Sequence, residues 1–407
     1  MRITVYSHDS YGLGNVRRMI AICEHLLATT EDLSILLISG SPMLHSFRLP
    51  EGLDYIKLPC LNRGQTGRPT AKYLKTGLAE TVRLRSELIL QAVAHFHPDV
   101  LLVDKNPRGL EGELEDTLYY VEQMLPPTRC VLLLRDILDR PEATIALWQK
   151  QGFHKTIEKF YASILVAGMP QVFDLVREYQ LPQATARKVH YCGYIAKPAG
   201  VQSIAQIRTG LGIAADRPLV LVTPGGGEDG FQLVERYLAD LERSPDGAFH
   251  SLVILGPEMP AERRRDCFAA ATRLPHLHML EFTDDLTSCI AAADAVVSMG
   301  GYNTICEILT LGKRAVVVPR VRPVEEQWIR SSRLEHMGLL TALHPDRIQA
   351  GELYTAVQSA LAQPVRPPCA RFDLNALGRI THHLLPGGET PVPPAYVPAL
   401  PPLEVAS

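Results

Sequence analysis

Paired cysteines are missing from this sequence of 407 residues. Its eight cysteines are scattered, and no two of them form a Cys-x-x-Cys pair. We therefore expect neither a zinc site nor a disulfide framework, and scattered thiols favour a reducing cytosol. An apolar run begins almost at the first residue, so we also expect no signal peptide.

A strong net charge and long apolar runs are lacking as well. The formal charge is -3, and no helix-turn-helix, RRM or zinc-finger pattern is present, which disfavours nucleic acid as a partner. No apolar run approaches the roughly 20 residues that a membrane-spanning helix needs. We expect a cytoplasmic protein, with peripheral contact at the inner face of the membrane left open.

Apolar runs and helical patterns alternate along the whole chain. DVLLVDK at 99–105 and TRCVLLLRD at 128–136 are continuously apolar at their centres, which is typical of parallel strands covered on both faces. Helical patterns lie between such runs, for example at Glu80–Phe96 and Glu113–Met124. This repetition predicts an α/β fold with doubly wound parallel sheets. The expected strands are Ile3–Ser7, Leu33–Ile38, Tyr55–Leu58, Val100–Val103, Cys130–Leu134, Ile164–Val166, Leu219–Val222, Leu252–Leu255, Leu277–Leu280, Ala295–Ser298 and Ala315–Val318.

A break in the alternation, GYIAKPAG at 193–200, separates two similar halves. At roughly 100–200 residues per domain, the length also predicts two domains. We expect domains over residues 1–195 and 196–368. A last helix over 369–386 and a proline-rich tail over 387–407, expected to be mobile, follow them.

Three glycine-bearing loops follow expected strands, at Gly12–Gly14, Gly225–Gly227 and Gly300–Gly301. Glycine lets a phosphate approach the backbone, and the next helix offers free N–H groups. One such loop is weak support, because tight strand–helix turns need glycine anyway, but two in one half strengthen the case. No loop has the P-loop pattern, and the first lacks the third glycine of G-x-G-x-x-G, which disfavours a nicotinamide dinucleotide site.

Asn303 and Glu307 share one face of the helix expected after Gly301. A carboxylate one turn into such a helix can accept hydrogen bonds from both hydroxyls of a ribose. On spacing alone, a solvated helix residue is an equally good interpretation of Glu307.

The second half resembles the nucleotide-sugar half of GT-B glycosyltransferases. The matching stretch is FTDDLTSCIAAADAVVSMGGYNTICEILTLGKRAVVVP at 282–319, followed by EEQWIRSSRLEHMGL. It is most similar to the type that contains the bacterial lipid II-forming N-acetylglucosaminyltransferase and the plant galactolipid synthases, with a family 28-like C-terminal domain. The features that carry the resemblance are the F-x-D-D-L turn at Phe282–Leu286, the Gly-Gly–helix–Glu307 arrangement, and Glu326-Gln327 after Pro319. It is specific over roughly Thr223 to Leu340 and weaker over the first half.

This resemblance implies two Rossmann-like domains that face a cleft. Residues 1–195 would bind the acceptor, residues 196–368 would bind the nucleotide sugar, and the last helix would cross back to the first domain. Glu307 would hold the ribose diol, the loop from Gly300 to Thr304 the diphosphate, and Gln327 the donor sugar. The expected donor-binding residues are Thr223, Gly225, Gly226, Gly227, Phe282, Leu286, Ser298, Gly300, Gly301, Asn303, Thr304, Glu307, Arg320, Glu326 and Gln327.

The catalytic base is the open question. In the family, the first loop usually carries a histidine that faces the reaction centre, whereas Asn15 or Val16 stands there in this chain. An amide takes no proton at neutral pH, so Asn15 suits hydrogen bonding to a substrate hydroxyl or helix capping. The substitutes are His8, Asp9 and Asp104, all expected at carboxyl ends of strands, and His8 suits base chemistry best. Asp9 could instead cap a turn, Asp104 could bind backbone N–H groups, and an acidic acceptor would need no base.

A basic stretch at 61–85, LNRGQTGRPTAKYLKTGLAETVRLR, follows the third expected strand. Related enzymes receive their acceptor there, so its cations could bind an anionic acceptor or lipid surface, although such runs are more often solvated. The cations are Arg63, Arg68, Lys72, Lys75, Arg83 and Arg85. The residues expected in the acceptor site or its loop are Gly12, Gly14, Asn15, Arg63 and Arg68.

The predicted activity is inverting transfer of a sugar from a nucleoside diphosphate sugar, expected to be a UDP-sugar, to an unidentified acceptor hydroxyl. This is a glycosyltransferase of the hexosyltransferase type. No Asp-x-Asp pair is placed to bind a metal, so we expect metal-independent transfer without a cofactor. Three alternatives share the architecture: a sugar-nucleotide epimerase, a nucleotide-sugar hydrolase and a non-catalytic sugar-nucleotide binder.

Overall fold

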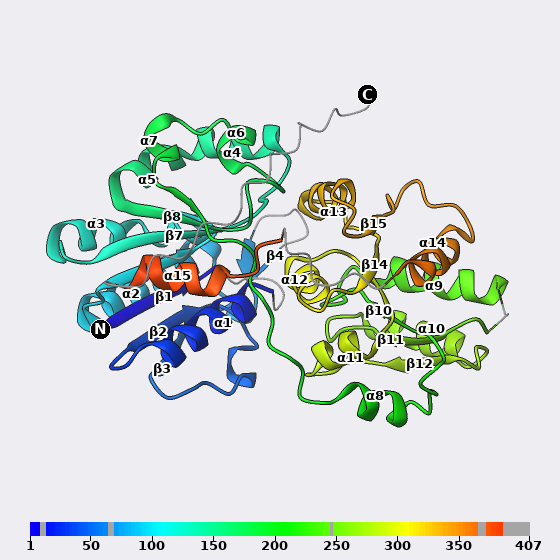
Figure 1. The fold of residues 1–407 in the computed structure, drawn as a ribbon. Coiled ribbons are helices and arrows are strands. Elements are labelled where there is room, and N and C mark those ends of the chain that lie inside the picture. Colours follow the sequence, from blue (N-terminus) through cyan, green and yellow to red (C-terminus); the bar gives the residue numbers. More distant parts are fainter. Residues whose placement is uncertain (9–13, 64–68, 245–246, 365–371, 386–407) are drawn as a thin grey trace. The chain divides into compact units, whose positions relative to one another are not determined.

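The computed structural model describes residues 1–8, 14–63, 69–244, 247–364 and 372–385. The chain divides into two units (Figure 1). One contains residues 1–194 and the segment that returns at Asn375, and the other contains residues 195–374. Asp9, Gly12 and Arg68 lie outside the described residues.

The first unit is built on a seven-stranded sheet in the order β3-β2-β1-β6-β7-β8-β9. Neighbouring strands are parallel throughout. The chain leaves β1 in one direction along the sheet and returns to its other side at β6, so the carboxyl ends of these two strands form the switch point at which doubly wound sheets bind ligands. The strands are β1 (Arg2–Ser7), β2 (Ser34–Ser39), β3 (Leu53–Lys57), β6 (Val100–Asp104), β7 (Arg129–Arg135), β8 (Tyr161–Ala167) and β9 (Val189–Tyr191).

Helices connect these strands, and a small hairpin stands apart from the sheet. The helices are α1 (Gly14–Thr29), α2 (Leu78–Phe96), α3 (Glu115–Met124), α4 (Pro141–Gln151), α5 (Phe153–Phe160), α6 (Leu175–Glu178), α7 (Gln183–Ala186) and α15 (Ala376–Leu384). The hairpin pairs β4 (Leu61–Arg63) with β5 (Pro69–Ala71). The last helix, α15, packs against α1, and Arg379 at its centre donates to the carbonyl oxygen of Cys192 at 3.0 Å.

The second unit repeats this plan with a six-stranded sheet in the order β12-β11-β10-β13-β14-β15. Its switch point lies between β10 and β13, which pair in parallel. The strands are β10 (Leu219–Thr223), β11 (His250–Ile254), β12 (Leu277–Leu280), β13 (Ala295–Ser298), β14 (Arg314–Val317) and β15 (Thr341–Ala342). The helices are α8 (Ile204–Gly210), α9 (Phe231–Arg243), α10 (Ala261–Ala271), α11 (Leu286–Ala292), α12 (Tyr302–Thr310), α13 (Glu326–His336) and α14 (Glu352–Ala362).

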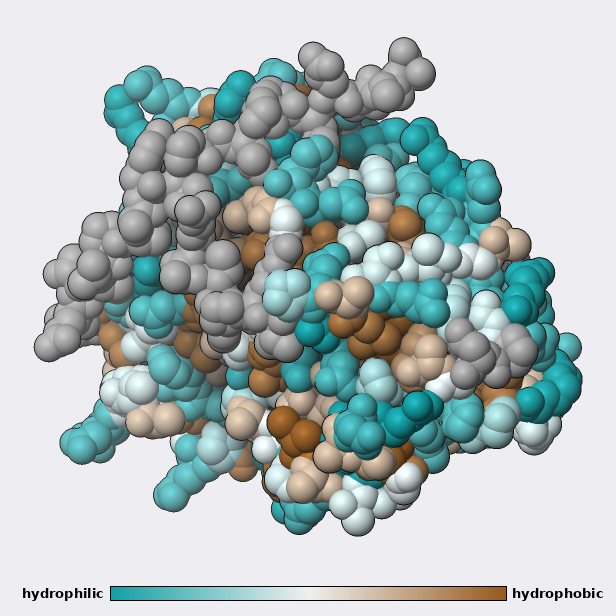
Figure 2. Space-filling model, turned by 45° about the vertical axis from the view of Figure 1, so that its right-hand side comes forward, coloured by the Kyte–Doolittle hydropathy of each residue, from teal (hydrophilic) through white to brown (hydrophobic). Residues whose placement is uncertain are grey.

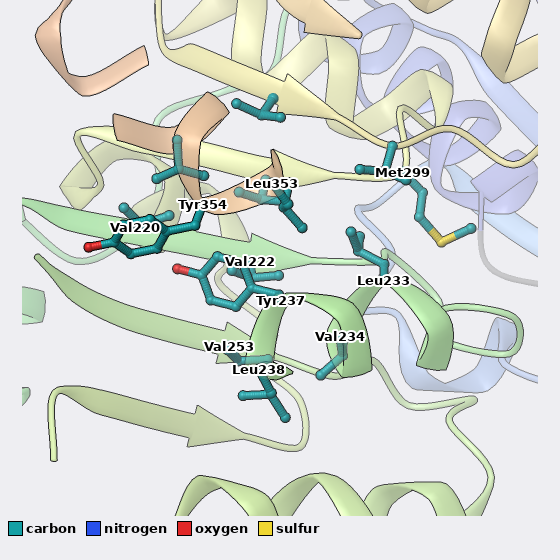
Figure 3. Close-up of a cluster of buried hydrophobic side chains, with 14 of the residues drawn as sticks. Val220, Val222, Leu233, Val234, Tyr237, Leu238, Val253, Met299, Leu353 and Tyr354 are labelled. Carbon is teal, nitrogen blue, oxygen red and sulfur yellow. The ribbon is translucent and has the colours of Figure 1, made fainter. Parts of the chain in front are cut away.

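An apolar core fixes α9 and α14 on the second sheet (Figure 3). Val220 and Val222 of β10 meet Tyr237 of α9 and Tyr354 of α14 in one buried cluster. The Tyr237 hydroxyl lies 2.8 Å from the hydroxyl of Ser251 on β11, so this buried polar group has a partner. The core thereby holds the strand–loop–helix connection that contains Gly225–Gly227.

The surface is an ordinary mixture of polar and apolar side chains. On the face drawn in Figure 2, hydrophilic residues surround smaller apolar groups. The most exposed large apolar side chains include Tyr73 at 67%, Met124 at 62% and Val201 at 93%. None of the helices in the described ranges is both long and apolar enough to span a bilayer.

The predicted α/β fold with two parallel sheets is confirmed. Each expected strand is present within three residues of its predicted limits, and the helices predicted at 80–96 and 113–124 are α2 and α3. The short strands β9 and β15 and the β4–β5 hairpin were not predicted. The last helix starts at Ala376, after the expected start at 369.

Candidate functional site

Two matching turns meet at the switch point of the second sheet. Thr223 and Ser298 are register partners at the ends of β10 and β13. The Thr223 hydroxyl accepts from the N–H of Gly225, and the Ser298 hydroxyl accepts from the N–H of Gly300, both at 3.3 Å. Gly225 and Gly300 have φ values of 85° and 73°, in the left-handed region that favours glycine. The strand-end hydroxyls thus shape both predicted phosphate loops in the same way.

The turn at Gly300–Gly301 leads directly into α12. A Cβ atom at Gly300 would lie 2.7 Å from Val317 Cγ1 and 2.9 Å from Ser331 Oγ, so the position is closed to other residues. At Gly301, by contrast, a Cβ atom would have no heavy atom within 4 Å. The first N–H groups of a helix lack partners in the helix itself, so the start of α12 suits an anion.

Glu307 is only 8% exposed. Its interpretation as a solvated helix residue is therefore wrong. Thr304 on the same helix is also 8% exposed, and both residues lie within two turns of Gly301. A buried carboxylate at this place fits a polar ligand group better than solvent, and its contact with a ribose stays a prediction.

The loop between β14 and α13 carries Arg320, Glu326 and Gln327. The N–H of Arg320 donates to Gln327 Oε1 at 2.9 Å. The Arg320 guanidinium lies 3.1 Å from Asp229 Oδ2 and 3.8 Å from Glu326 Oε1. The side-chain carbonyl of Gln327 therefore holds the loop between β14 and α13 in place. Its side-chain NH₂ group is then the part suited to a donor sugar.

A buried arginine that the sequence did not suggest supports the same loops. Arg330 on α13 is fully buried, and its Nη1 donates to the carbonyl oxygen of Gly300 at 3.2 Å. Its guanidinium lies 5.7 Å from the centre of the Tyr302 ring at the start of α12. Gln327 and Arg330 are three apart and so share a helical face, which is the one signal by which the sequence could have revealed Arg330.

Asp285 in the F-x-D-D-L turn has a structural role, which the sequence analysis did not predict. Asp285 Oδ1 accepts from the N–H of Ser288 at 3.2 Å and so caps α11. Its other oxygen accepts from the N–H groups of Val201 and Gln202. Burial alone would raise the pKa of Asp285, but hydrogen bonds from Ser288, Gln202 and Val201 outweigh it and lower the pKa. In the same turn, Phe282 is 46% exposed and Leu286 is half-buried.

In the first unit, His8, Asn15 and Asp104 gather at the switch point between β1 and β6. The Asn15 amide donates to the carbonyl oxygen of His8 at 2.8 Å, and Arg18 donates to Asn15 Oδ1 at 3.4 Å. Arg18 also donates to Asp104 Oδ1 at 2.6 Å, and both of these side chains are buried. Asn15 therefore ties the end of β1 to α1, which begins at Gly14.

His8 follows β1 and is half-buried, and its Nδ1 has no hydrogen-bond partner among the described residues. Burial lowers the pKa of His8 well below its usual 6.5, and the positive charges of Lys105, Arg85 and Arg135 lower it further. The imidazole is therefore neutral at physiological pH. It can accept a proton, as a weaker base than an ordinary histidine.

The cations of the basic stretch at 61–85 differ in their exposure to solvent. The prediction that Arg85 is a surface cation is wrong. Its guanidinium is 2% exposed and donates to both carboxylate oxygens of Glu113, which Tyr6 also contacts at 2.5 Å. Lys72 and Lys75 are exposed beside Tyr73 and Leu74. Arg63 ends β4, and the exposed Arg83 pairs with Glu87 at 2.9 Å.

Within the part of the chain that the structure describes, no three His, Cys, Asp or Glu side chains are grouped so as to hold a metal ion. The seven cysteines described there are all buried and free of disulfides.

The sequence has relatives among known proteins. Residues 219–365 match the family model of the glycosyltransferase family 28 C-terminal domain. The UDP-N-acetylglucosamine–N-acetylmuramyl-(pentapeptide) pyrophosphoryl-undecaprenol N-acetylglucosamine transferase of Cutibacterium acnes is 32% identical over 123 residues, which cover 30% of this chain and 32% of the relative. The enzyme of the same name from Methylorubrum extorquens is 28% identical over 237 residues, 56% of this chain and 60% of the relative. The chain thus spans about a third of the length of the first of these curated relatives.

Solved structures resemble nearly the whole chain. MurG of Acinetobacter baumannii has a TM-score of 0.60 at 13% identity, covering 94% of this chain and 98% of that one. UDP-GlcNAc 2-epimerase of Neisseria meningitidis has a TM-score of 0.60 at 14% identity, covering 94% and 99%. At such identities the likeness establishes the fold alone. The chain therefore has the GT-B fold, and its residues 219–365 are similar to the glycosyltransferase family 28 C-terminal domain.

Proposed function

We propose that this protein is an inverting glycosyltransferase that moves a sugar from a UDP-sugar to an acceptor hydroxyl. The observation that carries the proposal is the buried Glu307 on α12, behind the Gly300–Gly301 turn and inside the region that matches family 28. Glu307 would bind the ribose diol, while the start of α12 receives the diphosphate. The amide NH₂ of Gln327 is suited to the donor sugar.

In this reaction the acceptor hydroxyl attacks the anomeric carbon from the face opposite the leaving diphosphate. The protein positions both substrates and stabilises the departing charge. The N–H groups after Gly225 and Gly301 and the guanidinium of Arg320 would supply that stabilisation without a metal ion. His8 or Asp9 would accept the proton of the hydroxyl, and Asp104 is less suited because it is buried against Arg18.

In this proposal, the acceptor binds to the first unit. It lies at the surface of an anionic membrane, which the first unit contacts. Lys72 and Lys75 lie exposed beside the exposed Tyr73 and Leu74. Cations combined with apolar side chains suit the interface of an anionic bilayer. The Cutibacterium acnes relative is named for a pyrophosphoryl-undecaprenol acceptor. Sedimentation with vesicles that contain anionic lipid, at low and high salt, tests this contact.

Incubation with a panel of UDP-sugars, with and without candidate acceptors, tests the activity. Transfer to an acceptor with inversion at the anomeric carbon is the expected result. The fold is shared with UDP-GlcNAc 2-epimerases, so an epimerised sugar formed without an acceptor would replace the proposal with an epimerase. Free UDP plus free sugar would indicate a hydrolase, and intact donor that stays bound would indicate a binding protein.

A further inference from the structure

Arg320 and Asp229 form an ion pair that crosses the end of β13. Asp229 lies between β10 and α9, and Arg320 lies between β14 and α13. Both strands are neighbours of β13, one on each side, so their ends are about 10 Å apart at the usual strand spacing. Arg320 Nη1 and Asp229 Oδ2 nevertheless approach to 3.1 Å. The pair therefore bridges the two loops beside the Gly300–Gly301 turn, from which α12 starts.

The backbone of Arg320 is held by a hydrogen bond, and its guanidinium lies between the carboxylates of Asp229 and Glu326. Its N–H donates to Gln327 Oε1 at 2.9 Å. Its guanidinium also lies 3.8 Å from Glu326 Oε1, and its Nε is buried with no hydrogen-bond partner among the described residues. The side chain of Asp229 is 45% exposed, against 5% for Glu326. Of these two contacts of Arg320, the ion pair with the exposed Asp229 is therefore the one that a bound ligand can replace.

We propose that Asp229 competes with the donor diphosphate for Arg320, holding the guanidinium until the nucleotide takes it over. This inference rests on the proposed function, because it requires a diphosphate at the start of α12. An exposed ion pair contributes little to stability, whereas a diphosphate offers a guanidinium more charge and two oxygens in a fitting geometry. The exchange therefore favours the diphosphate, and Asp229 reduces the affinity that Arg320 would otherwise confer.

Calorimetric titration of UDP into the full chain and into Asp229→Asn tests the competition. We expect UDP to bind about two- to fivefold more tightly to the variant, the range for an exposed ion pair. Uridine lacks the diphosphate, so its affinity should stay unchanged. In an Arg320→Gln background, Asp229→Asn should have no effect, because the two residues act through one contact.

A neighbouring pair supplies the matched control. Arg322 and Asp346 lie 3.0 Å apart in an exposed ion pair that starts from the same β14–α13 loop, so Asp346→Asn removes the same charge and should leave UDP affinity unchanged. Unchanged or weaker binding in Asp229→Asn would overturn the competition. An equal gain in Asp346→Asn, or a gain that persists in Arg320→Gln, would also overturn it, since either points to general repulsion. If the unaltered chain binds none of UDP, GDP or dTDP, the proposed function falls together with this inference.

Discussion

Arg18 on α1 lies 2.6 Å from Asp104 at the end of β6, and the two side chains are 2% and 0% exposed. Arg18 also contacts Asn15, which in turn holds the carbonyl oxygen of His8. One buried ion pair thus fixes the first helix against the switch point of the first sheet. The Oδ1 atom of Asp104 is therefore engaged in a structural contact, at one of the three positions where we expected the base.

Asp104→Asn should mainly destabilise the protein. Loss of the carboxylate leaves the Arg18 charge buried without a counterion, which typically costs about 3–5 kcal/mol. Chemical denaturation of the full chain measures this cost. Asp116→Asn changes an exposed carboxylate on α3 and should stay within about 0.5 kcal/mol of the parent. Equal stability of the two variants would show that the ion pair does not hold α1 in place.

Replacement of His8 tests the base directly. If His8 accepts the proton, His8→Ala should slow transfer by roughly 10²- to 10⁴-fold. Because burial and the cations Lys105, Arg85 and Arg135 lower the pKa of His8, its inflection in the pH–rate profile should lie below pH 6.5 and disappear in the variant. Asp9→Asn is the comparison. If neither variant slows transfer more than tenfold, the loop only holds substrate and the acceptor needs no base from it.

Chelation tests how the diphosphate is neutralised. In the proposed reaction, helix-start N–H groups and Arg320 take the place of a metal ion. Turnover should therefore survive excess EDTA. Complete loss of turnover that magnesium or manganese restores would contradict this part of the mechanism.

The docking of α15 should depend on pH. The His383 ring lies 4.5 Å from that of His190 and 5.6 Å from that of His382, measured between ring centres. Burial, followed by the charges of His190, His382 and Arg129, lowers the pKa of His383 from 6.5 to about 4. In the unfolded chain this histidine binds a proton as soon as the pH falls below 6.5, whereas the folded ring stays neutral down to about 4.

The stability that His383 contributes is thus present above pH 6.5 and lost as the pH falls towards 4. His383→Gln should flatten the decline in unfolding free energy over this window, measured by urea denaturation at several pH values. His45→Gln, at an exposed position, should leave the decline as it is. An unchanged slope in His383→Gln would show that the ring does not stay neutral in the folded protein.

The strands were predictable because their signal is local. β6 and β7 are continuous apolar runs, and each was expected within one residue of its observed limits. Strands β9 and β15 have three and two residues and lie at sheet edges. Their pairing depends on the strand beside them more than on their own sequence, so no local pattern reveals them.

The two glycine turns of the candidate site were predictable, because the backbone there needs a particular residue type. Gly225 and Gly300 have positive φ values, and glycine after a strand marks such a turn. The ion pairs were not predictable. Arg18 and Asp104 are 86 positions apart in the sequence, and Arg320 and Asp229 are 91 apart. From the sequence, Arg85 is expected to be a surface cation, whereas in the fold it is buried in an ion pair with Glu113.

Nucleotide binding by Glu307 is the central claim, and calorimetric titration of UDP into Glu307→Ala tests it most directly. Loss of charge-assisted hydrogen bonds to the ribose should cost about 1.5–3 kcal/mol, roughly a ten- to hundredfold weaker affinity, with the fold intact by circular dichroism. Glu262→Ala, at an exposed position on α10 of the same unit, should bind UDP as the parent does. An affinity in Glu307→Ala equal to that of Glu262→Ala and the parent would contradict the account.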